Sequence, residues 1–305
     1  MDISRANEDF HELCKIRVPS FKIPGMLTLA RSLILKDRPV PAKGVSFTEE
    51  DWGGKQVRIC VPDKLKSDTA LFLIHGGGLI MGTPVVNDQL ASIVASKLGI
   101  RVFSPAYRLA PEHKAPAAID DCLSSWTALQ ETAERYGVDP HRIVLGGNSA
   151  GGGLAACLAH RLVDAGSIQP LALALIYPML DDRTALDKEK QDVDYFVWSN
   201  KSNLYGWRAY LGRDRMGTSD LPDDFAAARR KDLSGLPPTW IGVGDIDLFL
   251  EENERYADKL KAAGVEVDVK IMPGAPHAFE TYASDSAISV EFIGSYLDFL
   301  ERHIP

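Results

Sequence analysis

The chain of 305 residues has few cysteines, and it lacks basic clusters and long apolar runs. Its four cysteines form no Cys-x-x-Cys pair, so we interpret them as free thiols in a reducing compartment. No apolar run is long enough to span a bilayer, and the first nine residues carry charges where a signal peptide needs an apolar core. These absences predict a cytoplasmic protein without membrane contact.

The charge balance is acidic, with a net charge of −8. An acidic chain without a basic run is not expected to bind nucleic acid, which leaves small neutral or cationic molecules as the expected ligands. Hydrophobic residues make up 45% of the chain, enough to fill a core without a disulfide or a structural metal.

Strand-like and helix-like segments alternate along most of the chain. Apolar strand patterns occupy residues 70–74, 101–104, 143–145, 171–176 and 239–243, with alternating ones at 55–61 and 266–271. Helical patterns occupy residues 88–98, 116–136, 152–165, 251–263 and 287–303. Such alternation predicts an α/β fold with a mostly parallel sheet flanked by helices.

Two segments do not fit the alternation. Residues 2–40 have an amphipathic helical pattern broken by Pro19 and Pro24, and residues 181–231 are polar, rich in aromatics and without a strand pattern. We expect them to pack on each other as a helical cap. The predicted organisation is a cap formed by residues 1–45 and 181–231 and a core formed by residues 46–180 and 232–305.

Ser149 is the candidate nucleophile. It lies in Gly147-Asn148-Ser149-Ala150-Gly151, between a predicted strand and a predicted helix. The glycines permit a tight strand-to-helix turn, which would expose the serine oxygen at the end of the sheet. A plain turn is the alternative, because Gly, Asn and Ser are common turn residues.

The sequence His75-Gly76-Gly77-Gly78 follows an interior strand pattern. Glycine-rich backbone leaves N–H groups free to bind an oxyanion. A flexible loop or a phosphate cradle is the alternative, although the Lys-Ser/Thr ending and the G-x-G-x-x-G frame of phosphate loops are absent.

His277 and an aspartate complete the candidate site. His277 follows the last strand pattern, and Asp245 and Asp247 follow the strand pattern at 239–243, so all three fall at the edge of the sheet where Ser149 lies. The order serine, aspartate, histidine is that of α/β-hydrolases. We favour Asp247 as the acid and expect Asp245 to cap the next helix. In the loop 107–112, we expect Arg108 and Glu112 to form a structural ion pair.

These motifs, together with Tyr107-Arg108-Leu109-Ala110-Pro111-Glu112 and His277-Ala278-Phe279, resemble the hormone-sensitive lipase family of α/β-hydrolases, the bacterial type IV esterases. The resemblance covers the chain from about residue 70 onward. It implies the α/β-hydrolase fold with a helical cap, and a serine carboxylesterase that acts on small, short-acyl esters without a cofactor or metal. It is also compatible with a homodimer.

The resemblance assigns further roles. It implies catalytic Ser149, Asp247 and His277, with oxyanion donors at Gly77, Gly78 and Ala150. Two positions depart from the family pattern. Leu248 stands where the family has a proline, which keeps Asp245 open as the acid, and Asn148 stands where the family usually has aspartate.

Two other functions use the same fold. An amidase or acyltransferase would have the same triad, because the leaving group and acceptor are selected by cap and pocket residues. A non-catalytic binding protein, as in the plant gibberellin receptors that resemble this family, would lack the triad histidine, whereas His277 is present here.

Overall fold

A computed structural model describes residues 1–16, 21–34 and 40–305. Its centre is one eight-stranded sheet in the order β1-β2-β4-β3-β5-β6-β7-β8. The strands are β1 (Val45–Asp51), β2 (Gln56–Pro62), β3 (Ala70–Ile74), β4 (Arg101–Pro105), β5 (Ile143–Asn148), β6 (Leu173–Ile176), β7 (Thr239–Gly244) and β8 (Val267–Met272). β2 is antiparallel to β1 and β4, and the remaining pairs are parallel, which confirms the predicted fold class.

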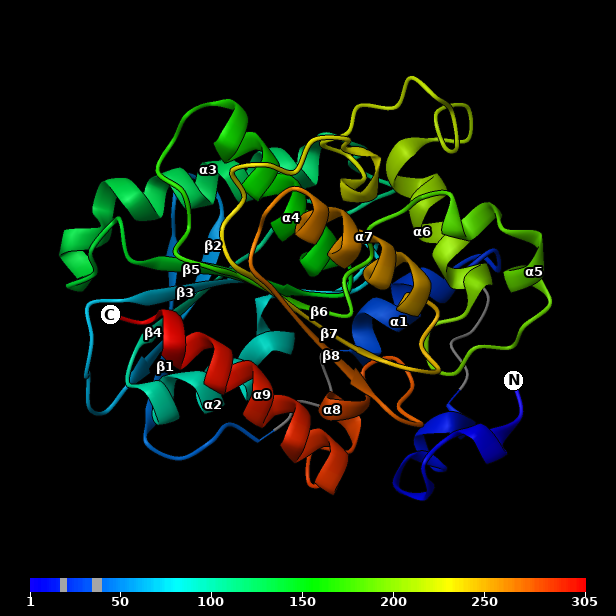
Figure 1. Cartoon of the computed structure of the whole chain (residues 1–305), viewed down its shortest axis with the longest axis horizontal. Helices are drawn as coiled ribbons and strands as arrows, with labels where there is room; N and C mark the ends of the chain where they lie inside the picture. Colours follow the sequence, from blue (N-terminus) through cyan, green and yellow to red (C-terminus); the bar gives the residue numbers. More distant parts are fainter. Residues whose placement is uncertain (17–20, 35–39) are drawn as a thin grey trace.

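Helices cover both faces of the sheet (Figure 1). One face carries α3 (Ala117–Thr132), α4 (Ala150–Asp164) and α7 (Leu250–Ala262), and the other carries α2 (Asp88–Leu98) and α9 (Ala287–His303). The central strands have apolar side chains on both faces because both faces are covered. Each face therefore has its own buried apolar cluster.

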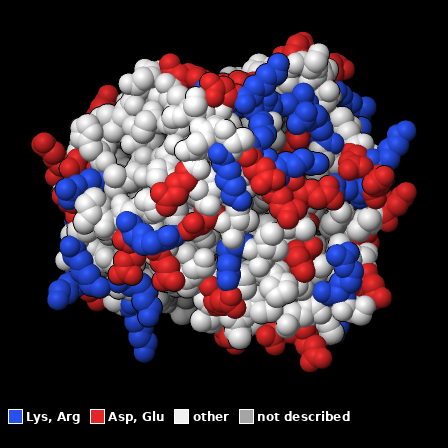
Figure 2. All heavy atoms as spheres, viewed as in Figure 1, with Lys and Arg blue, Asp and Glu red and all other residues white. Residues whose placement is uncertain are grey.

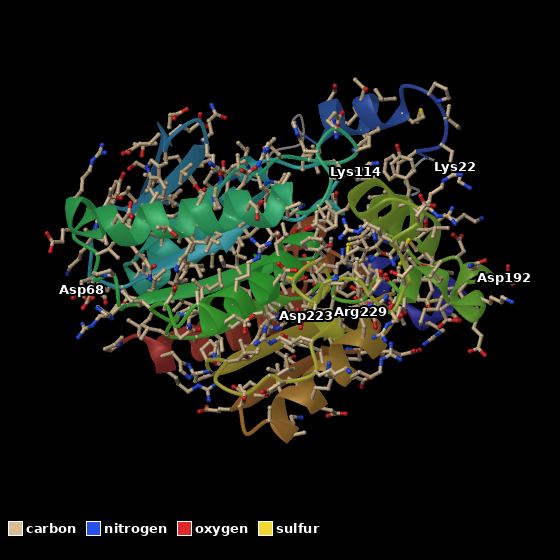
Figure 3. All side chains as sticks on the ribbon, turned by 90° about the horizontal axis from the view of Figure 1, so that it is seen from above. Lys22, Asp68, Lys114, Asp192, Asp223 and Arg229 are labelled. Carbon is tan, nitrogen blue, oxygen red and sulfur yellow. The ribbon has the colours of Figure 1, made fainter. Side chains whose placement is uncertain are left out.

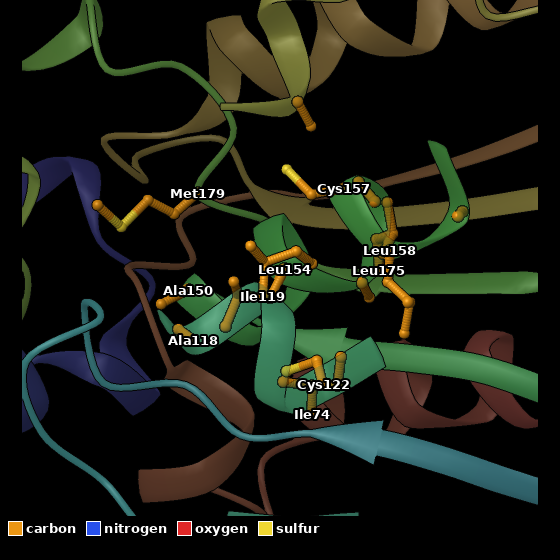
Figure 4. Close-up of a cluster of buried hydrophobic side chains, with 14 of the residues drawn as sticks. Ile74, Ala118, Ile119, Cys122, Ala150, Leu154, Cys157, Leu158, Leu175 and Met179 are labelled. Atoms are coloured by element: carbon orange, nitrogen blue, oxygen red, sulfur yellow. The ribbon is translucent and has the colours of Figure 1, made fainter. Parts of the chain in front are cut away.

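The four cysteines form no disulfide and are buried. Figure 4 shows Cys122 of α3 and Cys157 of α4 among aliphatic side chains of the core, where they pack as small apolar residues. Burial raises the pKa of the Cys60 thiol to about 12, and it also raises the pKa of the Cys122 and Cys157 thiols. These thiols are therefore neutral and poorly reactive.

The N-terminal segment differs from the expected amphipathic helix. Short 3₁₀ turns cover Ile3–Arg5, Glu8–Phe10 and Leu13–Lys15, and among the described residues of this segment α1 (Met26–Leu33) is the one α-helix. Pro19 lies outside the described residues. A polar side chain caps the first two turns instead of extending a helix, because Asp2 and Asn7 accept hydrogen bonds from backbone N–H groups two residues on.

The mid-chain insertion contains α5 (Lys188–Gln191) and α6 (Asn200–Leu211), which lie at the end of the molecule opposite the C-terminus (Figure 1). As expected, insertion aromatics pack on the N-terminal segment: the ring of Phe21 lies 5.4 Å from that of Tyr205 and 6.4 Å from that of Trp198. α8 (Phe279–Tyr282) is a single turn before α9.

The surface shows charges of both signs. On the face in Figure 2, acidic and basic side chains are intermixed and leave a large uncharged area. No helix in the described ranges combines the length and apolarity that a bilayer crossing requires.

Candidate active site

Ser149 lies at a sharp turn between β5 and α4, with φ 53° and ψ −120°. A non-glycine residue rarely adopts this conformation, so the surrounding packing must hold it. At Gly147 a Cβ would lie 2.3 Å from the carbonyl oxygen of Gly151, and at Gly151 it would lie 2.1 Å from that of Ile74. Only glycine therefore allows strand and helix to approach this closely.

Ser149, His277 and Asp247 form one hydrogen-bonded chain. His277 Nε2 lies 3.0 Å from Ser149 Oγ, and His277 Nδ1 lies 2.7 Å from Asp247 Oδ2. A carboxylate can only accept, so Nδ1 carries the proton and donates it, which leaves the Nε2 lone pair to accept from the serine hydroxyl. All three side chains are buried, so this arrangement is shielded from bulk water.

The imidazole ring of His277 is held on both sides by aromatic rings. The Tyr177 ring centroid lies 4.5 Å from it at an interplanar angle of 57°, and the Phe249 ring lies 5.3 Å away, nearly perpendicular at 83°. Phe249 also donates its backbone N–H to Asp247 Oδ1 at 2.9 Å. No sequence motif marks either aromatic, and each is remote in sequence from His277, so neither could be predicted as part of the site.

Asp245 has a different partner. Its Oδ1 accepts the backbone N–H of Gly274 at 2.7 Å, so it holds the loop that leads to His277 rather than the imidazole itself. The expectation that Asp245 caps the following helix is wrong, since α7 begins after Phe249 without a side-chain cap.

The glycine loop packs directly against the candidate nucleophile. A Cβ at Gly76 would lie 3.0 Å from the Asn148 carbonyl oxygen and 3.3 Å from Ser149 Cβ. Gly77 and Gly78 have φ of 118° and 60°, conformations that favour glycine. The N-terminus of α4, which starts at Ala150, adjoins the same serine. The three expected oxyanion donors thus lie in the two segments that border Ser149.

His75 supports this loop as a neutral side chain. Its ring stacks on that of Tyr107 at 4.1 Å and 12°, and the Tyr107 hydroxyl donates to the His75 carbonyl oxygen at 2.9 Å. Burial lowers the pKa of His75 to about 4, so it does not serve as a cation near neutral pH.

The expected ion pair between Arg108 and Glu112 does not form. Arg108 Nε instead donates to Asp121 Oδ2 on α3 at 2.8 Å, and Glu112 receives both terminal nitrogens of Arg31 at 2.8 Å. Arg31 comes from α1, 81 residues earlier, so local sequence could not reveal it. Its guanidinium lowers the pKa of Glu112 to about 2.

Arg31 also reaches the backbone next to the glycine loop. Its Nε donates to the Ile80 carbonyl oxygen at 2.7 Å, and its Nη2 donates to the Ala110 carbonyl oxygen at 2.9 Å. One side chain of α1 therefore links the N-terminal segment to both loops beside the site.

Asn148, which replaces the family's aspartate, points its Oδ1 into the protein without a hydrogen-bond partner. A buried carboxylate at this place would carry a charge without a donor, whereas the neutral amide leaves only one oxygen unpaired. The free-energy cost of burial is therefore lower for the asparagine amide than for an aspartate carboxylate at this position.

The mid-chain insertion packs directly against the glycine loop beside Ser149. A Cβ at Gly206 of α6 would lie 2.6 Å from the Gly78 carbonyl oxygen, and one at Gly78 would lie 2.3 Å from the Trp198 indole. Beside Ala150 remains an apolar cavity of about 10 Å³. Its lining comes from the glycine loop, α4 and the insertion: Leu79, Ala150, Gly153, Leu154, Cys157, Met179, Trp207, Tyr210, Phe225, Ala226 and Ala227.

A much larger cavity, about 1060 Å³, lies between the N-terminal segment and the outer side of α6. Phe21, Lys22, Asp192, Tyr205 and Arg208 contribute to its lining, which includes none of the three hydrogen-bonded residues. In Figure 3, Lys22 and Asp192 lie at the end of the molecule opposite Asp68. Within the described part of the chain, no three His, Cys, Asp or Glu side chains gather as a metal ion requires.

The chain matches known proteins over most of its length. The model of a family with the alpha/beta hydrolase fold matches residues 71–281. A carboxylesterase of Mycobacterium tuberculosis, NlhH, is 31% identical over 95% of this chain and 89% of its own. An ethyl acetate hydrolase of Pseudomonas putida is 29% identical over 88% of this chain and 85% of its own.

Solved structures agree with these matches. A bacterial heroin esterase superimposes with a TM-score of 0.90, at 30% identity, and the match covers 99% of each chain. The match includes the sheet, the flanking helices and the segments that form the candidate site.

Proposed function

The chain belongs to the hormone-sensitive lipase family of α/β-hydrolases and is a carboxylic ester hydrolase, and we propose that it cleaves small esters with short acyl groups at Ser149. The observation that carries the proposal is the hydrogen-bonded chain from Ser149 through His277 to Asp247. Each atom in it has the partner that nucleophilic acyl transfer requires.

The reaction proceeds in two halves. His277 Nε2 takes the proton of Ser149 as Oγ attacks the ester carbonyl, and the backbone N–H groups of Gly77, Gly78 and Ala150 bind the oxyanion. The intermediate collapses, the alcohol leaves with the proton from His277, and an acyl-enzyme remains. Water then attacks the acyl-enzyme by the same route and releases the acid. Asp247 keeps Nδ1 protonated and stabilises the imidazolium.

The size of the apolar cavity supports the preference for short acyl groups. A cavity of about 10 Å³ beside Ala150 is close to the smallest that holds one water molecule, so only a very small acyl group fits without side-chain movement. The Pseudomonas relative is named for ethyl acetate, an ester with a two-carbon acyl group. A bulky acyl group would have to displace Trp207 or Tyr210.

We propose that residues 1–45 and 181–231 act together as the cap and that residues 46–180 and 232–305 form the catalytic core. The contacts of Phe21 with Tyr205 and Trp198 support this division. The buried cysteines, which form no disulfide, support a reducing compartment such as the cytoplasm. A homodimer is compatible with the exposed position of Ile271 on the edge strand β8, and light scattering would test it.

The experiment is steady-state hydrolysis of p-nitrophenyl esters from acetyl to dodecanoyl, with Ser149→Ala in parallel. We expect a maximum at acetyl to butyryl that the variant loses. Turnover retained by Ser149→Ala would reject the assignment of the nucleophile, and a maximum at long chains would reject the short-acyl preference. Greater turnover of the matching anilides would instead support the amidase.

Trp207→Ala tests the cavity itself. The variant should move the optimum toward longer acyl groups, because it removes an indole from the cavity wall. Trp52→Ala is the matched control, since Trp52 packs against Phe103 and Tyr136 instead. An unchanged acyl preference in Trp207→Ala would place the acyl group elsewhere.

A further inference from the structure

A second carboxylate, Glu280, is buried close to His277. It follows the histidine by three residues and lies in the single turn α8, and only 8% of its surface is exposed. Ala278, between the two, has a left-handed backbone with φ 61°, which turns the chain sharply after the histidine. Glu280 matched no motif in the sequence, and the reaction described above does not use it.

Tyr177 connects this carboxylate to the imidazole. Its hydroxyl donates a hydrogen bond to Glu280 Oε1, and its ring lies against the His277 ring at 4.5 Å. The backbone fixes Tyr177 where β6 ends: its N–H donates to the Gly242 carbonyl oxygen at 2.6 Å, and its φ is 34°. The Tyr177 hydroxyl therefore binds the Glu280 carboxylate, while the Tyr177 ring packs on the His277 imidazole.

Besides Tyr177, few groups around Glu280 stabilise a negative charge on its carboxylate. The Thr281 hydroxyl donates to Oε1 at 3.2 Å, and Oε2 has no hydrogen-bond partner. From α9, the neutral Ser289 hydroxyl contacts the Phe279 carbonyl oxygen, and from the N-terminal segment Phe10 packs on the Phe279 ring. Among the described residues, no lysine or arginine forms an ion pair with Glu280.

The charged groups that act on this pair are therefore His277 and Asp247. The pKa of Glu280 is raised above its ordinary value, chiefly by burial, although the Tyr177 hydroxyl, its own backbone N–H, the charge of His277 and the Thr281 hydroxyl act in the opposite direction. Burial, the charge of Glu280 and that of Asp247 raise the pKa of Tyr177 far above its ordinary range, so the phenol stays a hydrogen-bond donor.

We propose that Tyr177 and Glu280 are positioning residues for ester hydrolysis, in which Tyr177 holds the His277 ring and Glu280, in its ionised form, supplies a second negative charge that stabilises the imidazolium. This inference rests on the proposed function of Ser149 and His277. The serine proton moves only to His277 Nε2 and from there to the leaving alcohol. Tyr177 and Glu280 exchange no proton with the substrate, and they act through ring contact and charge alone.

The test is the pH dependence of kcat/KM for p-nitrophenyl acetate in Glu280→Gln and Tyr177→Phe. Glutamine keeps the shape and removes the charge, so a neutral imidazole should persist to lower pH. We expect the acidic limb to move down by about half a unit to one unit, with a 3- to 10-fold loss of kcat on the plateau. Tyr177→Phe keeps the ring and removes the donor from Glu280, and its acidic limb should move in the same direction by less.

Glu252→Gln is the matched control, because Glu252 is also a fully buried glutamate but its partners are Leu180, Asp181 and Thr184. Its profile should coincide with that of the wild type. Active-site titration with a p-nitrophenyl phosphonate would correct each rate for folded enzyme.

An acidic limb that does not move in Glu280→Gln would overturn the inference. If that variant does not fold, an unmoved limb in Tyr177→Phe would overturn it equally. The proposed function fails differently: Ser149→Ala would then retain turnover, or the wild type would show no ester turnover to profile.

Discussion

At the scale of single residues, the two aspartates after β7 show how strongly position determines role. Asp247 bonds the imidazole and Asp245 bonds a backbone N–H, although they are two residues apart. The sequence favoured Asp247 but left Asp245 open, because the curvature of a loop, which decides where each carboxylate points, is not encoded in spacing alone.

Asp247→Asn should lower kcat about 10³- to 10⁴-fold, because an amide cannot keep the required imidazole tautomer and charge. Asp245→Asn should cost less than about 10-fold, since an amide oxygen still accepts from Gly274. Steady-state kinetics on p-nitrophenyl acetate, with circular dichroism as the folding check, measure the difference. The reverse ranking would reassign the acid.

Gly78→Ala should lower kcat on the order of 10²-fold, because the new methyl group meets the Trp198 indole and displaces an oxyanion donor. Gly166→Ala is the matched control: it also has a left-handed φ, 59°, but nothing lies within 4 Å of the new Cβ. Both variants carry about 1 kcal/mol or more of backbone strain.

Kinetics and thermal unfolding of the two alanine variants separate strain from displacement. A double variant with Trp198→Ala should recover part of the activity of Gly78→Ala. Equal activity of Gly78→Ala and Gly166→Ala would show that the Gly78 N–H does not bind the oxyanion.

At the scale of elements, α1 is important because of one side chain. Arg31 fastens this eight-residue helix to the backbone at Ile80 and Ala110 and to Glu112. The helix is too short to be stable alone, so its place depends on such contacts. The cap is thus connected to the loops beside the site by charge-assisted hydrogen bonds as well as by aromatic packing.

Arg31→Ala should lower kcat/KM about 10-fold and raise hydrogen exchange in residues 76–82, because the glycine loop loses a donor that fixes Ile80. Arg5→Ala, in another turn of the N-terminal segment, should change neither. Hydrogen-exchange mass spectrometry with parallel kinetics tests both. Normal exchange and activity in Arg31→Ala would show that the loop is fixed without α1.

The elements that were missed lie where burial leaves no pattern. β1 has no buried side chain and contains two apolar residues, Val45 and Phe47, which are too few to predict a strand; it pairs with β2 at the edge of the sheet. The interior strands and the long helices were predicted closely, with α9 matching residue for residue. Strands buried on both faces give continuous apolar runs, and helices buried on one side give an amphipathic pattern, so both can be recognised in the sequence.

At the scale of the whole molecule, the fold class followed from the alternation of strand and helix patterns, and the family followed from motifs in a fixed order. The contacts that connect distant segments, such as Arg31 with Glu112 and Tyr177 with Glu280, could not be read because each partner looks ordinary in its own neighbourhood. The motifs identify the residues that react, whereas the contacts that hold those residues in place arise from tertiary packing.

A buried glutamate also links the stability of the whole protein to pH. Burial, with the nearby Asp181, raises the pKa of Glu252 to about 8, while in the unfolded chain it is near 4.5. The folded state therefore holds a proton that the unfolded state releases, so this contribution to stability is full below about pH 4.5 and is lost as pH rises toward 8.

Glu252→Gln should remove this pH-dependent loss of folding stability, because glutamine is neutral at every pH and resembles the protonated acid. The free energy of unfolding of the variant should exceed that of the wild type by a few kcal/mol at pH 8.5, at about 1.4 kcal/mol per pKa unit, and by much less at pH 5. Urea unfolding at the two pH values measures it. A difference independent of pH would contradict the prediction.

Ser149 and His277 are synthesised at different times because they lie far apart in the chain. A ribosome adds the histidine 128 residues after the serine, which at 5–20 residues per second is roughly 6 to 26 seconds later. Throughout that interval the nascent chain has a nucleophile without a base. The hydroxyl is an ordinary alcohol until His277 arrives, so a growing chain is protected from acylation by the esters around it.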